Sequence, residues 1–169
     1  MAKTSDHAMT AAEAAALDAA TGDAVAAAGA AGGAIGGAIG GGIGAGRMGA
    51  VGGASGARFG ARFLKPRTVE ITVEVPCAPD TVRERATALI ADSGRLIDDP
   101  NESDDGSVWG IVASGAMNMM PALVRVQAEA AGPGQSRVHI RATGKEGLIK
   151  QRIGAKAADR IAKAISQTP

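Results

Sequence analysis

Few side chains in this sequence have types and spacing suited to chemistry, and the first candidate is a glycine motif. Gly44-Ala-Gly46-Arg-Met-Gly49 matches the G-x-G-x-x-G pattern of dinucleotide-binding turns, and Glu70 stands near the position of the acid that binds the ribose in such folds. The residues before this motif form a Gly-rich four-residue repeat rather than a β-branched strand, and the pattern after it predicts no βαβ unit. We therefore expect no nucleotide site.

An acid-rich segment, Asp98-Asp-Pro-Asn-Glu-Ser-Asp-Asp-Gly106, offers carboxylates to a calcium ion. EF-hand spacing counted from Asp99 fails, because Asp104 stands where glycine is required and Gly110 where the bidentate glutamate is required. The composition favours a solvated hairpin loop without a metal.

Cys77 is the only cysteine, so an internal disulfide and a cysteine-based metal cluster are excluded. No histidine lies near it in the sequence to activate its thiol. His139 alternates with Arg137 and Arg141 on a strand face that we expect to be wet. Since the chain also offers no Ser-His-Asp set and no carboxylate pair with a base, we predict a non-enzyme with no catalytic, cofactor-binding or metal-binding residues.

The most distinctive feature is a four-residue repeat from Ala34 to Lys65. In a helix this period stacks small residues along one side, which lets a second helix approach closely. We therefore predict a glycine zipper with two neighbouring rows and a single ridge of large apolar residues. The first row is Gly32, Gly36, Gly40, Gly44, Gly52, Gly56 and Gly60, the second is Gly29, Gly33, Gly37 and Gly41, and the ridge is Ile35, Ile39, Ile43 and Val51.

Residues 24–46 carry no charge, and as a helix they have the length that crosses a hydrocarbon layer of about 30 Å. Their apolarity is marginal, so the helix needs a helical partner, and we expect a homo-oligomer in a membrane. The basic residues that follow, from Arg47 to Arg67, place the C-terminal domain in the cytoplasm. A hairpin that turns near Gly42 to Gly46 would bring Arg58 into its second limb. A disordered leader on a cytoplasmic protein is the other alternative.

Charge divides the chain into blocks although the net charge is only +1, a value that does not favour nucleic acid as a partner. The expected parts are a polar Ala-rich tail (1–23), the glycine-zipper segment (24–65) and a small domain (66–169). In the tail, Thr10-Ala-Ala-Glu13 has the form of a capping box that opens a helix, and we expect that helix to be frayed. The acidic start lacks the features of a secretory signal.

Residues 66–169 predict an α+β domain in the order β-α-β-β-β-β-α, with an antiparallel sheet of four to five strands and both helices on one face. Alternation from Thr68 to Val75 marks the first strand, and Pro79 opens a helix that ends at Ser93. Later strands are expected at 95–98, 107–114, 122–130 and 136–143. The closing helix is expected from Leu148 to Ser166.

Two surfaces of this domain are further binding candidates. A cleft between the sheet and the closing helix could hold a small apolar ligand. Its residues would be Trp109, Met117, Met119 and Met120. The closing helix has a basic face suited to anionic lipid, RNA or an acidic partner. That face comprises Lys150, Arg152, Lys156, Arg160 and Lys163.

Residues 68–165 resemble small bacterial domains of unknown function in which a Val-Pro-x-x-Pro-x-x-Val entry to the first helix precedes a meander and a closing helix. The entry here is Val75-Pro76-Cys-Ala-Pro79-Asp-Thr-Val82, and Ser136-Arg-Val-His-Ile-Arg141 also resembles that type. Such domains often follow a lipoprotein or membrane leader, so the resemblance implies this fold and membrane association. The same entry is similar to that of helix-grip proteins related to polyketide cyclases and lipid-transfer domains. That similarity implies the alternative of a soluble module that binds a small hydrophobic ligand.

Overall fold

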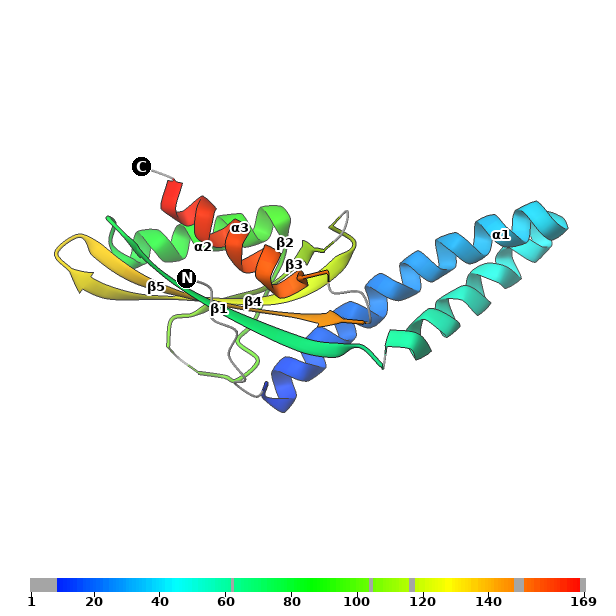
Figure 1. Cartoon of the computed structure of the whole chain (residues 1–169), viewed down its shortest axis with the longest axis horizontal. Helices are drawn as coiled ribbons and strands as arrows, with labels where there is room; N and C mark the ends of the chain where they lie inside the picture. The colour runs from blue at the N-terminus through cyan, green and yellow to red at the C-terminus, as the bar shows by residue number, and fades with distance from the viewer. Residues whose placement is uncertain (1–8, 62, 104, 116–117, 148–150, 168–169) are drawn as a thin grey trace. The chain divides into compact units, whose positions relative to one another are not determined.

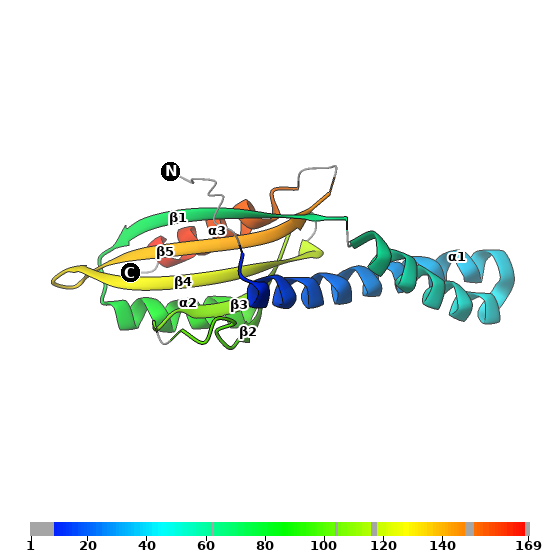
Figure 2. The same cartoon turned by 90° about the horizontal axis from the view of Figure 1, so that it is seen from below.

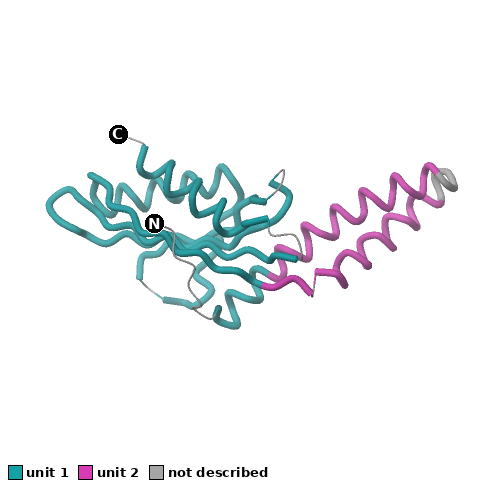
Figure 3. The backbone as a smooth tube through the Cα atoms, in the orientation of Figure 1, with its two compact units in different colours: residues 1–17, 66–169 teal, residues 18–65 magenta. Residues whose placement is uncertain are grey.

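The computed structural model describes residues 9–61, 63–103, 105–115, 118–147 and 151–167, and within the first helix it leaves out the side chains of 40–44. The chain forms two units, which Figure 3 colours separately. Unit 1 comprises residues 1–17 and 66–169, and unit 2 comprises residues 18–65. The elements in chain order are α1 (Ala11–Ala61), β1 (Lys65–Val75), α2 (Pro79–Ser93), β2 (Gly94–Ile97), β3 (Val108–Ser114), β4 (Met120–Gly132), β5 (Gln135–Glu146) and α3 (Ile153–Gln167).

Unit 1 is built on a five-stranded antiparallel sheet in the order β1-β5-β4-β3-β2, with α2 and α3 on one face (Figures 1 and 2). This arrangement confirms the predicted α+β class, the order of the elements and the number of strands. Strand β1 forms one edge of the sheet, beside β5. There Thr68 Oγ1 and Thr143 Oγ1 lie 2.9 Å apart in a buried hydrogen bond. The last strand of the meander therefore joins the first strand to the rest of the sheet.

The core lies between the sheet and the two helices, and period-two and period-3.6 patterns in the sequence explain it. Helix α2 contributes Val82, Ala86 and Ile90, as predicted from the stripe that follows Pro79. Helix α3 contributes a second stripe of buried residues. They are Ile153, Gly154, Ala157, Ala158, Ile161, Ala162 and Ile165.

The start of α3 differs from the sequence prediction. The helix begins at Ile153 rather than Leu148, and residues 148–150, including Lys150, lie outside the described part of the chain. Arg152 has a φ of 55°, a left-handed conformation that no helix continues through. Glu146 Oε1 then accepts a hydrogen bond from the backbone N–H of Ile153 at 2.9 Å, so a carboxylate from β5 satisfies the first turn of α3.

The capping box predicted at the N-terminus is confirmed. Thr10 Oγ1 accepts a hydrogen bond from the Glu13 N–H at 3.2 Å, and Glu13 Oε2 accepts one from the Thr10 N–H at 3.0 Å. The expectation of a frayed helix here was wrong, because Glu13 is 2% exposed and Leu17 is fully buried. This first part of α1 is a component of unit 1 rather than a tail.

Unit 2 is a helical hairpin. Its residues up to Ala61 belong to one assigned helix, α1, but the chain reverses direction within that helix. Its two limbs run antiparallel, since Gly29 lies against Gly53, Gly33 against Gly49, and Gly37 against Ala45. The hairpin that the sequence offered as an alternative is therefore the observed form, and it includes Arg58 in the second limb.

Candidate functional site

The two limbs of the hairpin touch backbone to backbone along the second predicted glycine row. A Cβ atom at Gly33 would clash with the carbonyl oxygen of Gly49, and one at Gly29 would lie 2.8 Å from the Cβ of Ala57. Only residues without a side chain permit this approach, which brings many backbone atoms into dispersion contact. The zipper predicted from the sequence thus has the second limb of its own chain as a partner.

The described members of the first predicted row do not take part in this contact. A Cβ atom added at Gly32, Gly36, Gly52, Gly56 or Gly60 would meet nothing within 4 Å. The packing around Gly40, Gly41 and Gly44 is not described. The sequence also missed Gly49 and Gly53 as packing residues. A hairpin centred on residue 41 would have predicted them, because the two members of each contact pair lie equally far from residue 41 in the sequence.

Large apolar side chains of the hairpin are exposed. Ile39 is 84% exposed, and the others range from 61% to 79%. They are Ile35, Met48, Val51, Phe59 and Phe63. A surface helix normally buries such residues, so this surface is suited to lipid or to another apolar surface.

One helical stretch, Ala11–Ile39, has the length and composition of a membrane span, with 29 residues and a mean hydropathy of 1.2 in its most apolar window. A signal sequence near an N-terminus has the same properties, so length and apolarity by themselves are weak evidence for a span.

The sheet face away from α2 and α3, here called the outer face, carries a band of charged and polar side chains. Trp109, Arg125 and Arg141 stand side by side on β3, β4 and β5 in direct register. Arg141 Nη1 donates to Glu13 Oε1 at 2.9 Å, and its Nε lies 3.8 Å from Glu70 Oε1. Asn101 Nδ2 donates to the same oxygen of Glu13 at 3.3 Å. These contacts hold the first turn of α1 against the outer face.

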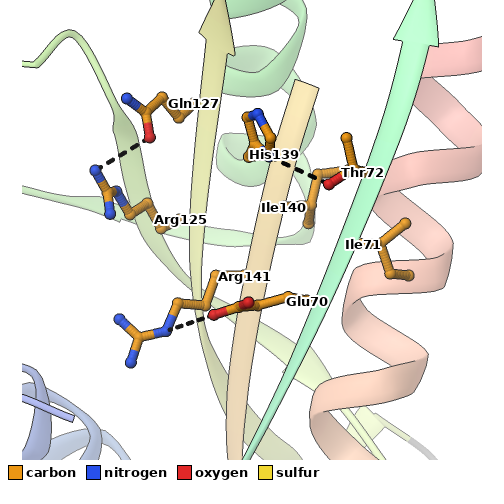
Figure 4. Close-up of a pocket in the computed structure, with 8 residues that line it drawn as sticks. All are labelled: Glu70, Ile71, Thr72, Arg125, Gln127, His139, Ile140 and Arg141. Atoms are coloured by element: carbon orange, nitrogen blue, oxygen red, sulfur yellow. Dashed lines mark hydrogen bonds and ion pairs between the residues drawn. The ribbon is translucent and has the colours of Figure 1, made fainter. Parts of the chain in front are cut away.

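A hollow of about 230 Å³ lies on the outer face over β1, β5 and β4 (Figure 4). Glu70 and Arg141 point toward one another at one end of it, and Thr72 and His139 meet at the other. The hollow is smaller than most ligand pockets, whose volumes begin at about 300 Å³. Arg125 and Arg141, which line the hollow, already have partners within unit 1. These side chains therefore connect neighbouring strands and loops rather than form a site for a charged ligand.

Thr72, His139 and Glu129 stand in the order hydroxyl, imidazole, carboxylate that nucleophilic enzymes use. The Thr72 Oγ1 to His139 Nδ1 distance is 3.2 Å, but His139 Nε2 lies 4.0 Å from Glu129 Oε2, beyond hydrogen-bond reach. Both His139 and Glu129 are well exposed, and the neighbouring backbone N–H groups serve the β-ladder rather than an oxyanion. The arrangement pairs strands and lacks the geometry of a catalytic triad.

Arg125 links the outer face to the loop before β3. It forms an ion pair with Asp105, donates to Ser107 Oγ at 3.0 Å, and lies with its guanidinium 5.4 Å from the ring centroid of Trp109. Burial by itself would raise the pKa of Asp105, but hydrogen bonds from Ser107 and the charge of Arg125 outweigh it, so the pKa is lowered.

The predicted apolar cleft is not formed by its described members. Trp109 lies on the outer face, because its neighbour Gly110 faces Ile90 of α2. Met120 packs against the core on the opposite face, and Met119 is 56% exposed. Met117 lies outside the described residues. The physical reason is the strand alternation in β3, which puts Trp109 on the side away from the closing helix.

The predicted basic face of the closing helix is partly occupied. Arg160 Nη2 donates to the Ala113 carbonyl oxygen at 2.6 Å and thus ties α3 to β3. Arg152, Lys156 and Lys163 are exposed. The surface that is available to a partner is therefore narrower than the sequence predicted.

Within the described residues, no group of three or more His, Cys, Asp or Glu side chains is placed to hold a metal ion. In the acid-rich loop, Asp99 accepts from the N–H of Asn101 at 2.8 Å and from that of Ser103 at 3.2 Å, which closes the loop on itself. A comparison of the chain with models of protein families and with curated protein sequences finds no match.

Proposed function

We propose that this chain is a non-enzymatic membrane protein, anchored by the unit 2 hairpin, that displays unit 1 as a cytoplasmic interaction domain. The observation that carries the proposal is the exposure of the large apolar side chains of the hairpin, from 61% to 84%. In water these side chains would form an aggregation-prone surface, whereas in lipid their transfer is favourable.

Unit 1 is formed by chain segments from both sides of the hairpin, which supports a hairpin that enters and leaves the membrane on the same side. Residues 9–17 and 66–167 belong to the same unit, joined by the 2.9 Å hydrogen bond between Arg141 and Glu13. A single crossing by residues 24–46 would separate these segments by a bilayer. Each limb has about 20 residues and a length of about 30 Å, which is enough to reach the opposite side and return.

Charge supports the same topology. Asp18, Asp23 and Arg58 lie at the ends of the hairpin that join unit 1, and Arg47 follows the close pair Gly37 and Ala45 at the other end. Arg47 is the one charge between residues 24 and 57. Its long side chain can extend its guanidinium to the far interface. The basic residues after Ala57 favour the cytoplasm for unit 1.

We also propose that hairpins associate with one another through the first glycine row. The backbone is accessible at five glycines, because no atom outside the neighbouring turns of the same helix lies within 4 Å of a Cβ added there. They are Gly32, Gly36, Gly52, Gly56 and Gly60. In lipid, dispersion contact between such surfaces is a main driving force for helix association.

Fractionation of cells that express the full chain tests the anchor, together with protease protection of tags at the two ends. We expect the chain to remain in the membrane after carbonate extraction, with both tags on the cytoplasmic side. Recovery in the soluble fraction would contradict the anchor, and tags on opposite sides would contradict the hairpin topology.

The alternative of a soluble module that binds a small apolar ligand has less support. The described candidates for its cleft, Trp109 and Met120, lie on opposite faces of the sheet. The hollow on the outer face is lined mainly by charged and polar side chains.

A further inference from the structure

The end of unit 1 at which the hairpin returns carries exposed basic side chains from two distant parts of the sequence. Arg67, at the start of β1, and Arg152 and Lys156, at the start of α3, are all exposed. Their backbones are close, since a Cβ atom at Gly154 would lie 3.1 Å from the carbonyl oxygen of Arg67. We call Arg67, Arg152 and Lys156 the basic end.

The acid at the end of β5, Glu146, is buried and does not contribute an exposed negative charge to this surface. Glu146 is 9% exposed, and its Oε1 accepts the hydrogen bond from the Ile153 N–H at 2.9 Å. Asp159 is exposed three residues beyond Lys156 on α3, so it is a neighbour of Lys156 on the helix surface. The basic end therefore has three exposed cations and one exposed acid beside it, for a net charge of +2.

Chain connectivity keeps Arg67 within a short stretch of chain from the last residue of the hairpin helix. Unit 1 resumes at Pro66, so Arg67 is six residues past Ala61, the last residue of α1. Even a fully extended chain of that length spans only about 20 Å. If the hairpin lies in a bilayer, Arg67 is therefore within about 20 Å of the residue at which the hairpin ends, which is within reach of the headgroup layer.

We propose that the basic end binds the headgroups of anionic phospholipids. This inference rests on the proposed membrane anchor, which supplies the surface, and adds a lipid specificity to it. The chemistry is that of a juxtamembrane basic cluster, in which each Lys or Arg near an anionic leaflet gains attraction that salt screens.

The test uses the full chain reconstituted in phosphatidylcholine vesicles that contain a trace of dansyl-labelled phosphatidylglycerol or, in parallel, dansyl-labelled phosphatidylcholine. Trp109 is the only tryptophan and serves as the energy donor. The test variant is Arg67→Gln with Lys156→Gln. The matched control is Arg95→Gln with Lys163→Gln, which removes the same charge from exposed positions on β2 and farther along α3.

For the wild-type chain we expect Trp109-sensitised emission to favour the anionic probe about fivefold or more, and the preference to fall in high salt. The ratio of emission from the anionic probe to emission from the phosphatidylcholine probe should fall to about one in the test variant. In the control variant this ratio should stay within a factor of about two of the wild-type value. Equal emission from both probes in the wild type would overturn the proposal, and so would an equal loss in the control. Arg67→Lys with Lys156→Arg should keep the preference, which separates charge from any folding defect.

Flotation with pure phosphatidylcholine vesicles tests the anchor separately. A chain that floats with these vesicles but shows no preference for the anionic probe retains the anchor and refutes the basic end. A chain that floats only with vesicles containing phosphatidylglycerol, and only with Arg67 and Lys156 intact, refutes the anchor and supports the basic end. If the test variant instead loses affinity for a single-stranded RNA oligonucleotide while its lipid preference is unchanged, the surface is a nucleic-acid site and the proposal is wrong.

Discussion

Glu13 Oε1 accepts a hydrogen bond from Arg141 Nη1 at 2.9 Å, across 128 residues of chain. The other carboxylate oxygen of Glu13 accepts from the Thr10 N–H, so one side chain caps α1 and fixes it to the sheet. Glu13 is 2% exposed, and the side chain of Arg141 is 17% exposed. The pair is therefore largely desolvated, and loss of one partner leaves a buried charge.

Replacement of Glu13 should destabilise unit 1. We expect Glu13→Ala to lower the free energy of unfolding by about 3 kcal/mol, because Arg141 then loses its closest carboxylate. Glu13→Gln keeps an acceptor for the Thr10 N–H and should cost about 1 kcal/mol. Urea unfolding of the full chain in detergent, followed by Trp109 fluorescence, measures both. Glu84→Ala, at an exposed site on α2, should change stability by less than about 0.5 kcal/mol. Losses for both Glu13 variants that are no larger than that of Glu84→Ala would contradict a stabilising ion pair.

The hairpin predicts a specific cross-link. A Cβ atom at Gly46 would lie 3.5 Å from the Cβ of Ala38, a separation at which disulfides form. In a Cys77→Ser background, Ala38→Cys with Gly46→Cys should oxidise readily to an intramolecular disulfide, seen as a mobility shift that reductant reverses. Ile39→Cys with Gly46→Cys is the control, since Ile39 is 84% exposed and should remain reduced under mild oxidation. An uncross-linked first pair would exclude the observed register of the limbs.

The two glycine rows predict different defects for the same substitution. Gly33→Leu places a side chain against the Gly49 carbonyl oxygen, so the limbs must separate at a cost of about 2 kcal/mol or more. Gly36→Leu meets open space and should leave the hairpin closed. We expect Gly33→Leu to reduce the cross-link between positions 38 and 46, and Gly36→Leu to leave it intact but weaken self-association in analytical ultracentrifugation. Self-association that is insensitive to Gly36→Leu would rule out pairing through the first row at this position.

Asp105 should give unit 1 an acid-sensitive contribution to stability. Its pKa is lower in the folded protein than in the unfolded chain, so its contribution is complete above the unfolded value, near 4, and is lost as the pH falls through the folded value. The difference in the free energy of unfolding between wild type and Asp105→Asn should therefore shrink as the pH falls from about 5 to about 2, a range that brackets the ordinary pKa of an aspartate. Urea unfolding at several pH values measures it. A difference that grows with acid would reverse the sign of the inferred shift.

Trp109 should not respond to apolar ligands. Its ring is 3% exposed on the outer face, under the guanidinium of Arg125. We expect a blue-shifted emission that acrylamide quenches weakly and that fatty acids do not change in titrations of the detergent-solubilised chain. A saturable change on titration would support the ligand-binding alternative and weigh against our assignment of unit 1.

Local pattern predicted the parts of the fold that local physics determines. Alternation along β1 and the stripe that follows Pro79 located the first strand and α2 correctly, because period and helix-start signals act within a few residues. The start of α3 was missed because it depends on Glu146, a residue of the preceding strand that reaches the Ile153 N–H. Such a cap is a tertiary contact that periodicity does not reveal.

The candidate site was harder to predict for the same reason. Glycine recurs in two neighbouring rows, and the sequence contains nothing local that decides which row closes against a partner or where that partner lies. Gly33 is chosen because Gly49 faces it after the chain reverses, while Gly36 points to open space. Likewise, the capping box predicted the helix start at Thr10 but not the burial of Glu13, which requires Arg141.

The division of unit 1 around the hairpin has a consequence for the order of events during synthesis. Glu13 emerges from the ribosome 128 residues before Arg141, a delay of about 6 to 25 s at typical elongation rates. Throughout that interval the hairpin is available and unit 1 lacks its sheet. In the topology that we propose, the hairpin therefore inserts first, and unit 1 closes afterwards on a segment that the bilayer already holds in place.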